Sequence, residues 1–407
     1  MTPNQLTFRW ISIVLLAFLL FFIGLAGGTT RAGDSSGEVF AVYTQSGLAH
    51  YYSLEYEKAV YDFQKAVDAN PEDARSYNHL LEAVLFRELY KHDALDTSLY
   101  TQEGFLNSRQ VVVDPAIKQQ IRELVEKALA LSEKRLKSNP KDPQALYARG
   151  VTRGLRSTYL GLIEKSWFSA LRSALGSRSD HEAVLALKPD FVDAKTVVGI
   201  HNYIVAVLPL RTKVLASLIG VTGDKKKGLD YLAEAGKAGG ESNADARVAL
   251  ALFLRREQRY DDAIQVVQSL VKDYPRNFLF ALEQANVMKD GGKGPAAIAV
   301  YRRLLDDCKT GKFPDPHINL AQFGLGEALR GQNQYQEALQ AYEAAGSAGG
   351  ENHDLRQRAL VAAGEVSDLM AQRQEAVKNY KEAIAIDGAG EEAGVARRYL
   401  DKPYKGK

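Results

Sequence analysis

Small and aromatic residues recur along the chain at one fixed helical spacing. In five segments a small residue is followed four positions later by an aromatic or branched residue, and three positions after that by a small or apolar residue. Side chains three and four positions apart share one face of a helix. The pattern therefore predicts helices that pack through small residues. The five triplets are Ala59-Phe63-Ala66, Ala263-Val267-Leu270, Ala297-Tyr301-Leu304, Ala338-Tyr342-Ala345 and Ala376-Tyr380-Ala383.

A second set of small residues lies twelve positions before each leading alanine and extends the pattern to a preceding helix. Two helices with small residues where they cross, repeated about every 34 residues, form the unit of a stacked helical array. Such an array grows without a single closed core and presents extended surface. We therefore expect an all-α chain with surface rather than a catalytic pocket. The preceding small residues are Gly47, Ala251, Ala285, Gly326 and Gly364.

Several spaced positions together resemble the tetratricopeptide repeat. Residues 198–235, with the sequence VGIHNYIVAVLPLRTKVLASLIGVTGDKKKGLDYLAEA, are also similar to an inclusion-body-clearance or outer-membrane family of such proteins. The resemblance implies a right-handed α-solenoid of antiparallel helix pairs, a bacterial exported type of protein and no catalysis. The agreeing positions are Tyr43, Gly47, Ala59, Phe63, Ala66 and Pro71 in the first unit, and Gly326, Ala338, Tyr342 and Ala345 in the seventh.

The spacing and the breaks in it also predict a domain organisation. An insertion near 98–114 interrupts the second unit, and Asp114-Pro115 has the form of a helix cap followed by proline at the first helical position. The predicted segments are a signal peptide or anchor at 1–26, a linker at 27–37, an irregular repeat half at 38–243, regular repeats at 244–390, and a capping helix with a polar, mobile tail at 391–407.

The amino terminus has the layout of an export signal. Residues 10–26 are uncharged and apolar, Arg9 and the terminal amine precede them, and small residues follow. This arrangement is typical of a secretory signal peptide, although the apolar run is also close to the length of a membrane-spanning helix. A cleaved signal and a retained anchor that contacts the membrane through residues 10–26 both remain open. Either one predicts an exported body in the periplasm or cell envelope.

Charge and residue types exclude several functions. The 52 basic and 50 acidic residues give a net charge of +2, which does not predict nucleic-acid binding. Cys308 is the single cysteine, and the seven histidines lack the paired spacing of metal ligands. Sequence motifs for nucleophilic catalysis are also missing. We therefore expect no enzymatic activity, no cofactor and no metal site.

The resemblance implies that the first helix of each pair lines a concave face. That face would be aromatic and apolar toward the amino end and would carry mixed charges, such as Glu327, Arg330, Glu365 and Asp368, toward the other end. Aromatic anchors with an amide suit a bound peptide, so the expected partner is another protein or peptide. The alternative is that the aromatic residues pack inside the chain. The predicted partner-binding residues are Tyr51, Tyr52, Asn78, Phe86, Tyr147, Tyr203, Arg255 and Arg256.

Residues 200–221 form the most apolar stretch of the body and suggest another function. Arg211 and Lys213 are their only charged residues, and Lys225, Lys226 and Lys227 follow. An apolar helix hairpin beside lysines is able to bind an anionic membrane surface. A wholly buried helix pair with a solvated lysine turn is the alternative. The sequence thus predicts a scaffold for protein–protein interaction at the cell envelope, with membrane or lipid association as the competing function.

Overall fold

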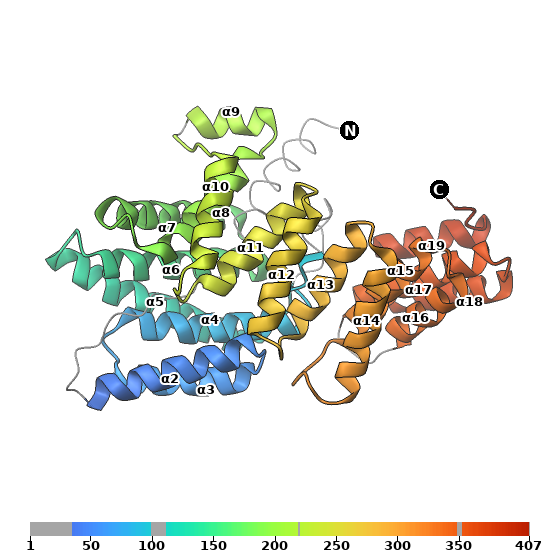
Figure 1. The fold of residues 1–407 in the computed structure, drawn as a ribbon, viewed down its shortest axis with the longest axis horizontal. Helices are drawn as coiled ribbons and strands as arrows, with labels where there is room; N and C mark the ends of the chain where they lie inside the picture. Colours follow the sequence, from blue (N-terminus) through green and yellow to red (C-terminus); the bar gives the residue numbers. More distant parts are fainter. Residues whose placement is uncertain (1–34, 99–110, 219, 348–351, 407) are drawn as a thin grey trace. The chain divides into compact units, whose positions relative to one another are not determined.

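The computed structural model of the 407-residue chain describes residues 35–98, 111–218, 220–347 and 352–406. Every regular element in these ranges is a helix, and they contain no strand (Figure 1). The predicted all-α class of stacked helix pairs is therefore confirmed. The signal or anchor segment at 1–26 and the core of the insertion, residues 99–110, lie outside the described residues.

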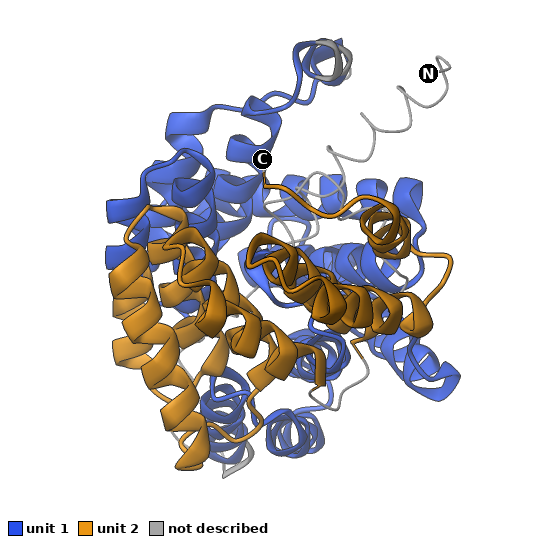
Figure 2. Cartoon of the chain, turned by 90° about the vertical axis from the view of Figure 1, so that its right-hand side faces the viewer, with its two compact units in different colours: residues 1–266 blue, residues 267–407 orange. Residues whose placement is uncertain are grey.

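The chain divides into two compact units, Met1–Val266 and Val267–Lys407 (Figure 2). Their boundary falls inside α12, Tyr260–Asp273. The predicted division at 243/244 concerns the regularity of the repeats and stays a prediction.

Unit 1 contains consecutive helices that pack as pairs, with α2 against α3, α6 against α7 and α8 against α10. A π-helical turn, η3, continues α6. The elements are α2 Ser35–Tyr52, α3 Tyr56–Ala69, α4 Ala74–Lys91, α5 Pro115–Ser138, α6 Pro143–Thr158, η3 Tyr159–Ile163, α7 Trp167–Leu187, α8 Val192–Ala206, α9 Leu210–Leu218, α10 Lys225–Lys237 and α11 Asn243–Arg256.

Unit 2 is built in the same way, with α13 against α14, α15 against α16 and α17 against α18. The first helices of successive pairs, α13, α15 and α17, also contact one another in order. A last helix, α19, packs on both α17 and α18. The elements are α13 Phe278–Asp290, α14 Gly294–Lys309, α15 Ile318–Gly331, α16 Tyr335–Ser347, α17 His353–Leu369, α18 Arg373–Ile386 and α19 Glu391–Asp401.

Local sequence signals set several helix ends. The Asp114 carboxylate accepts a hydrogen bond from the backbone N–H of Ala116 at 2.7 Å. Pro115 occupies the first helical position, as predicted. The last residue of α8 is Ala206, three residues before Pro209, where the missing backbone N–H and the ring oppose further helix.

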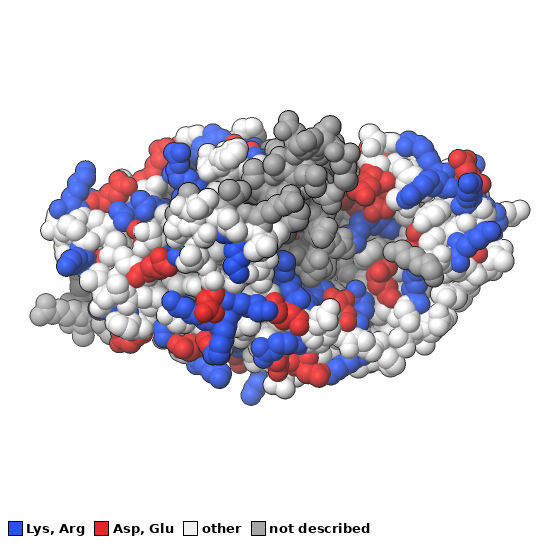
Figure 3. All heavy atoms as spheres, turned by 90° about the horizontal axis from the view of Figure 1, so that it is seen from above, with Lys and Arg blue, Asp and Glu red and all other residues white. Residues whose placement is uncertain are grey.

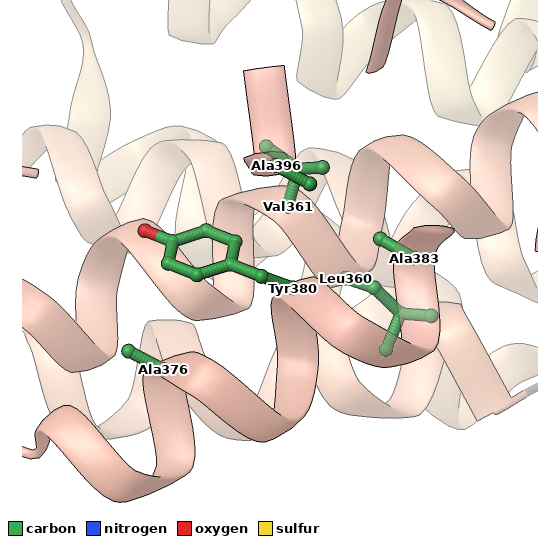
Figure 4. Packing of buried hydrophobic residues seen from close by; sticks show 6 residues of the cluster. All are labelled: Leu360, Val361, Ala376, Tyr380, Ala383 and Ala396. Carbon is green, nitrogen blue, oxygen red and sulfur yellow. The ribbon is translucent and has the colours of Figure 1, made fainter. Parts of the chain in front are cut away.

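The repeated triplets form the core between helices. In the last pair, Ala376, Tyr380 and Ala383 are buried with Leu360 and Val361 of α17 and with Ala396 of α19. The six side chains gather where α17, α18 and α19 meet (Figure 4). The two alanines let α18 approach its neighbours closely, and the tyrosine ring fills the space between them. The residues of this triplet, which the sequence pattern singled out, therefore make the contacts between the helices.

Candidate interaction surfaces

The predicted aromatic residues of α2 and α4 form one buried cluster. The ring centroids of Tyr51 and Tyr52 lie 5.2 Å apart in a T-shaped arrangement, and Phe86 lies 6.0 Å from Tyr51. The Tyr52 hydroxyl donates a hydrogen bond to Asp245 of α11 at 3.1 Å, and the Tyr51 hydroxyl lies 3.4 Å from Glu82. These aromatic side chains thus tie distant helices of unit 1 together.

Asn78 and Tyr147 are buried between α4, α6 and α7. The Asn78 amide donates to the carbonyl of Ala148 at 2.8 Å and accepts from the Thr152 hydroxyl at 2.7 Å. The Tyr147 ring packs edge-on against His181, with centroids 5.2 Å apart. Both side chains therefore have partners inside unit 1, and a ligand would have to displace those partners to reach them.

The remaining predicted residues lie on α8 and α11. The Tyr203 ring stacks on Phe253 with centroids 3.9 Å apart, and its hydroxyl donates to Glu257 at 3.0 Å. Arg255 is buried, whereas Arg256 is exposed. Of the eight predicted partner-binding residues, Arg256 alone is exposed. The other seven pack inside the chain, as the alternative interpretation of the sequence expected. Binding of a partner through these residues stays a prediction.

Helix α9 presents an apolar face to solvent. Leu210, Val214 and Leu218 are spaced four residues apart and are 77%, 51% and 77% exposed. In Figure 1, α9 lies beyond the ends of α8 and α10. The apolar stretch thus separates into a buried part, represented by Ile200 and Ile204 of α8, and an exposed helix. A wholly buried helix pair is not what the structure shows.

The lysines near α9 differ in their surroundings. Lys213 is exposed and its ammonium donates to the Ala206 carbonyl at 3.1 Å, whereas the side chain of Arg211 is outside the described part of the structure. Lys225 pairs with Glu257 at 2.6 Å, and Lys226 pairs with Asp230 at 2.7 Å. Lys227 lies over the Tyr231 ring, 5.3 Å from its centroid. All three lysines are exposed, and exposed pairs of this kind contribute little stability.

A charged surface runs along the first helices of unit 2. We call Glu327, Arg330, Glu365 and Asp368 the first-helix face of unit 2. Arg330 of α15 and Glu365 of α17 form an ion pair at 2.7 Å. The proximity of Glu365 raises the pKa of Arg330 despite the opposing effect of burial. Sequence reasoning placed these four residues on one face, and the structure brings Arg330, Glu365 and Asp368 together.

The Asp368 carboxylate connects this face to the second helix of the pair. Its side chain is 1% exposed and accepts hydrogen bonds from the Arg373 guanidinium at 2.9 Å and from the Tyr380 hydroxyl at 3.0 Å. Burial and the adjacent Asp368 carboxylate raise the pKa of Tyr380. The hydroxyl thus remains protonated and acts as a donor.

The carboxyl-terminal tail lies on the same face. The Tyr404 hydroxyl accepts a hydrogen bond from Arg330 Nη2 at 2.9 Å, and the Tyr404 backbone N–H donates to Asp368 Oδ2 at 2.9 Å. The sequence predicted a polar, mobile tail, and the structure places Tyr404 in specific contacts. The one signal for this placement is an aromatic residue after proline within an otherwise polar tail.

The described residues contain no group of three or more acidic, histidine or cysteine side chains arranged to hold a metal ion. Basic and acidic side chains are interspersed over the face drawn in Figure 3, which fits the balanced composition. No helix in the described ranges is both long and apolar enough to cross a membrane.

Comparison with known proteins supports the interpretation of the repeats. The family model described as "Tetratricopeptide repeat" matches residues 222–278 and 282–352. A comparison with curated proteins finds no match.

Solved structures that match the chain share little sequence with it. A tetratricopeptide repeat protein from Parabacteroides merdae is 12% identical over 80% of this chain and 99% of its own, with a TM-score of 0.34. The pilF protein of Pseudomonas aeruginosa is 15% identical over 64% and 99%, with a TM-score of 0.39. The Cut9–Hcn1 assembly is 13% identical over 90% and 56%, with a TM-score of 0.48. The match to the tetratricopeptide repeat family model thus covers residues 222–278 and 282–352 of this chain.

Proposed function

We propose that the chain is a non-enzymatic scaffold of the cell envelope that binds a segment of another protein on the first helices of its repeats. One observation carries the proposal. Arg330 and Glu365, on successive first helices, form a partly exposed ion pair across the first-helix face of unit 2. Charged side chains held in fixed positions along a row of helices are suited to recognise an extended partner.

The aromatic cluster of unit 1 is buried, so we do not place the binding surface there. Tyr51, Tyr52 and Phe86 are already packed against their own neighbours, so their surface is not open to a partner. We therefore place the principal binding surface on the first helices of unit 2, which retain partly exposed polar residues such as Lys289 of α13. Location at the envelope rests on the apolar residues 10–26 and the preceding Arg9.

Site-specific photocrosslinking in cells tests the scaffold. A photoreactive residue is introduced in place of Lys289 in α13, and the control carries it in place of exposed Lys378 in α18, a second helix. The expected result is one discrete crosslinked protein from position 289 and a much weaker product from position 378. Equal crosslinking at both positions, or substrate turnover abolished by a single substitution elsewhere in the chain, contradicts the proposed function.

A second candidate function is attachment to a membrane surface through α9. The observation that favours it is the exposed face formed by Leu210, Val214 and Leu218, which would bury apolar area in the interface region of a bilayer. Lys213 and the lysines at the start of α10 would add attraction to anionic lipids.

Vesicle sedimentation separates the two functions. A chain lacking residues 1–37 is mixed with phosphatidylglycerol or phosphatidylcholine vesicles, so that the apolar amino terminus does not contribute. Membrane attachment predicts binding to the anionic vesicles that is lost on the paired change Leu210→Ser and Leu218→Ser, and weakened when Lys225, Lys226 and Lys227 become glutamate. The matched control Phe168→Ser removes an exposed apolar residue on α7 and leaves binding intact. Without any binding to anionic vesicles, this function is excluded.

A further inference from the structure

The last residues of the chain lie against unit 2 in an extended conformation. Helix α19 ends at Asp401, and Lys402 has φ −131° and ψ 113°, which directs the chain away from the helix. Lys402, Pro403 and Lys405 are exposed, whereas Tyr404 is partly buried. One residue therefore anchors the tail, and the residues on either side of it face solvent.

Unit 2 contacts both the side chain and the backbone of Tyr404. Arg330 Nη2 donates to the Tyr404 hydroxyl at 2.9 Å, and the guanidinium carbon lies 5.3 Å from the ring centroid. Tyr399 packs against the same ring in a T-shaped arrangement at 5.2 Å. The Tyr404 N–H donates to Asp368 Oδ2 at 2.9 Å. Cation–π, aromatic and charge-assisted contacts thus converge on one residue.

The groups that contact Tyr404 are held in place by other parts of unit 2. Glu365 positions Arg330 through their ion pair, and Arg373 and Tyr380 fix the Asp368 carboxylate. Arg373 also donates to the carbonyls of Tyr399 and Leu400 at the end of α19, at 2.8 and 2.6 Å. The groups that contact Tyr404 thus also have partners in unit 2 outside the tail, which favours a pre-organised binding site.

The tail itself is held weakly compared with a helix of the core. Among its described residues Tyr404 is the single anchor, and Pro403 lacks a backbone N–H with which to form a hydrogen bond. A segment that is fixed at one residue opens at a lower free-energy cost than a helix packed along its whole length. Lys402 and Lys405 are exposed on either side of Tyr404, and the site of Tyr404 includes the Glu365 and Asp368 carboxylates, whose charge favours a basic segment.

We propose that the Tyr404 site, formed by Arg330, Glu365, Asp368 and Tyr399, binds an extended tyrosine-containing basic peptide of a partner protein, and that the chain's own tail occupies this site until the partner displaces it. This inference rests on the proposed use of the first-helix face for partner binding and names the chemistry of the partner segment. That segment carries a tyrosine preceded by proline and flanked by lysine or arginine, as the tail does.

The tail is covalently attached beside the site, so it competes more effectively for the site than a partner in solution does. A short linker holds its binding group at an effective concentration on the order of millimolar. A partner peptide in solution therefore binds the intact chain weakly and binds a chain whose anchor is removed more tightly. The substitution Tyr404→Ala removes the anchor and leaves the length and charge of the tail unchanged.

Fluorescence anisotropy of a labelled peptide with the sequence of residues 401–407 tests the proposal. We expect the full chain with Tyr404→Ala to bind this peptide at least about 10-fold more tightly than the unsubstituted full chain. A control peptide with alanine in place of tyrosine should not bind. Adding Arg330→Gln to the Tyr404→Ala chain should abolish binding of the tyrosine peptide, and circular dichroism melting should show that the double variant remains folded.

Two results would overturn the inference. One is a folded Tyr404→Ala chain that binds the tyrosine peptide no better than the unsubstituted chain does. The other is concentration-dependent dimerisation of the unsubstituted chain that Tyr404→Ala abolishes, because the occupant would then be the tail of a second copy. A discrete crosslink from position 289 that persists in either case leaves the scaffold function standing, so the two proposals fail separately.

Discussion

A Cβ atom placed on Gly326 would lie 2.7 Å from Cδ1 of Tyr342, sixteen residues further along the chain. The same relationship joins Gly47 to Phe63 and Gly364 to Tyr380, again sixteen residues apart. In each pair the glycine lies on the first helix and the ring on the second. The missing side chain therefore leaves the space that the aromatic ring occupies, and the helices pack through this contact.

The substitution Gly326→Ala tests this contact. We expect it to lower the free energy of unfolding by about 1–3 kcal/mol, because the added methyl group overlaps the fully buried Tyr342 ring. Urea titration followed by circular dichroism measures the change. Gly331→Ala is the matched control, since it lies in the same helix and a Cβ there meets no atom within 4 Å. The control should be neutral or stabilise by up to about 1 kcal/mol, as alanine favours helix more than glycine does. Equal effects of the two substitutions would refute the proposed role of the contact.

Local patterns in the sequence predicted much of the fold, because each depends on residues one or two helices apart. The spacing of Gly326, Ala338 and Tyr342 identified a helix pair and its core contact. Asp114-Pro115 identified a helix start. These signals act within about 34 residues, so they can be recognised without knowing how the pairs stack.

The accessibility of the predicted binding residues depends on contacts that no local pattern encodes. Tyr52 is buried because it reaches Asp245, 193 residues further along the chain. The apolar residues of α9 have the composition of a buried helix, yet the structure exposes Leu210 and Leu218. Contacts between distant helices decide which first-helix side chains are open to solvent, and sequence spacing does not record those contacts.

Substitutions at Tyr52 should affect stability before they affect binding. Tyr52→Phe removes the hydrogen bond to Asp245 and should cost about 1–2 kcal/mol. Tyr52→Ala also removes a buried ring and should cost about 3–5 kcal/mol. Chemical denaturation measures both. If Tyr52→Ala leaves the stability unchanged but abolishes binding of a partner protein, Tyr52 contacts the partner and is not primarily a core residue.

The buried Cys308 thiol should react slowly. Burial and the nearby Asp307 carboxylate raise the pKa of this thiol to about 11, which leaves little thiolate near pH 8. Because the thiolate is the reactive form, we expect native Cys308 to react with Ellman's reagent about 100-fold more slowly than the thiol of the same chain in guanidinium chloride. Absorbance at 412 nm follows the reaction. Similar rates in the two conditions would show that the end of α14 opens readily.

His181 should make the stability of unit 1 depend on pH. Its ring is fully buried, and Nδ1 donates to the Ser177 carbonyl at 2.7 Å. Burial lowers the pKa of His181 to about 4, against the weaker opposing effects of Ser177 and Asp180. The unfolded chain, in which a histidine has a pKa of about 6.5, therefore takes up a proton that the folded chain does not bind.

The stabilisation from neutral His181 is thus complete above about pH 6.5 and decreases as the pH falls toward 4, at a rate of up to about 1.4 kcal/mol per pH unit. Urea titrations at several pH values between 7 and 4.5 measure this slope for the unsubstituted chain and for His181→Gln. The substitution should reduce the dependence of the unfolding free energy on pH by the contribution of one histidine. This holds even if glutamine lowers the stability at every pH. If the two slopes are the same, His181 takes up a proton as readily in the folded chain as in the unfolded chain, and burial does not hold its ring neutral.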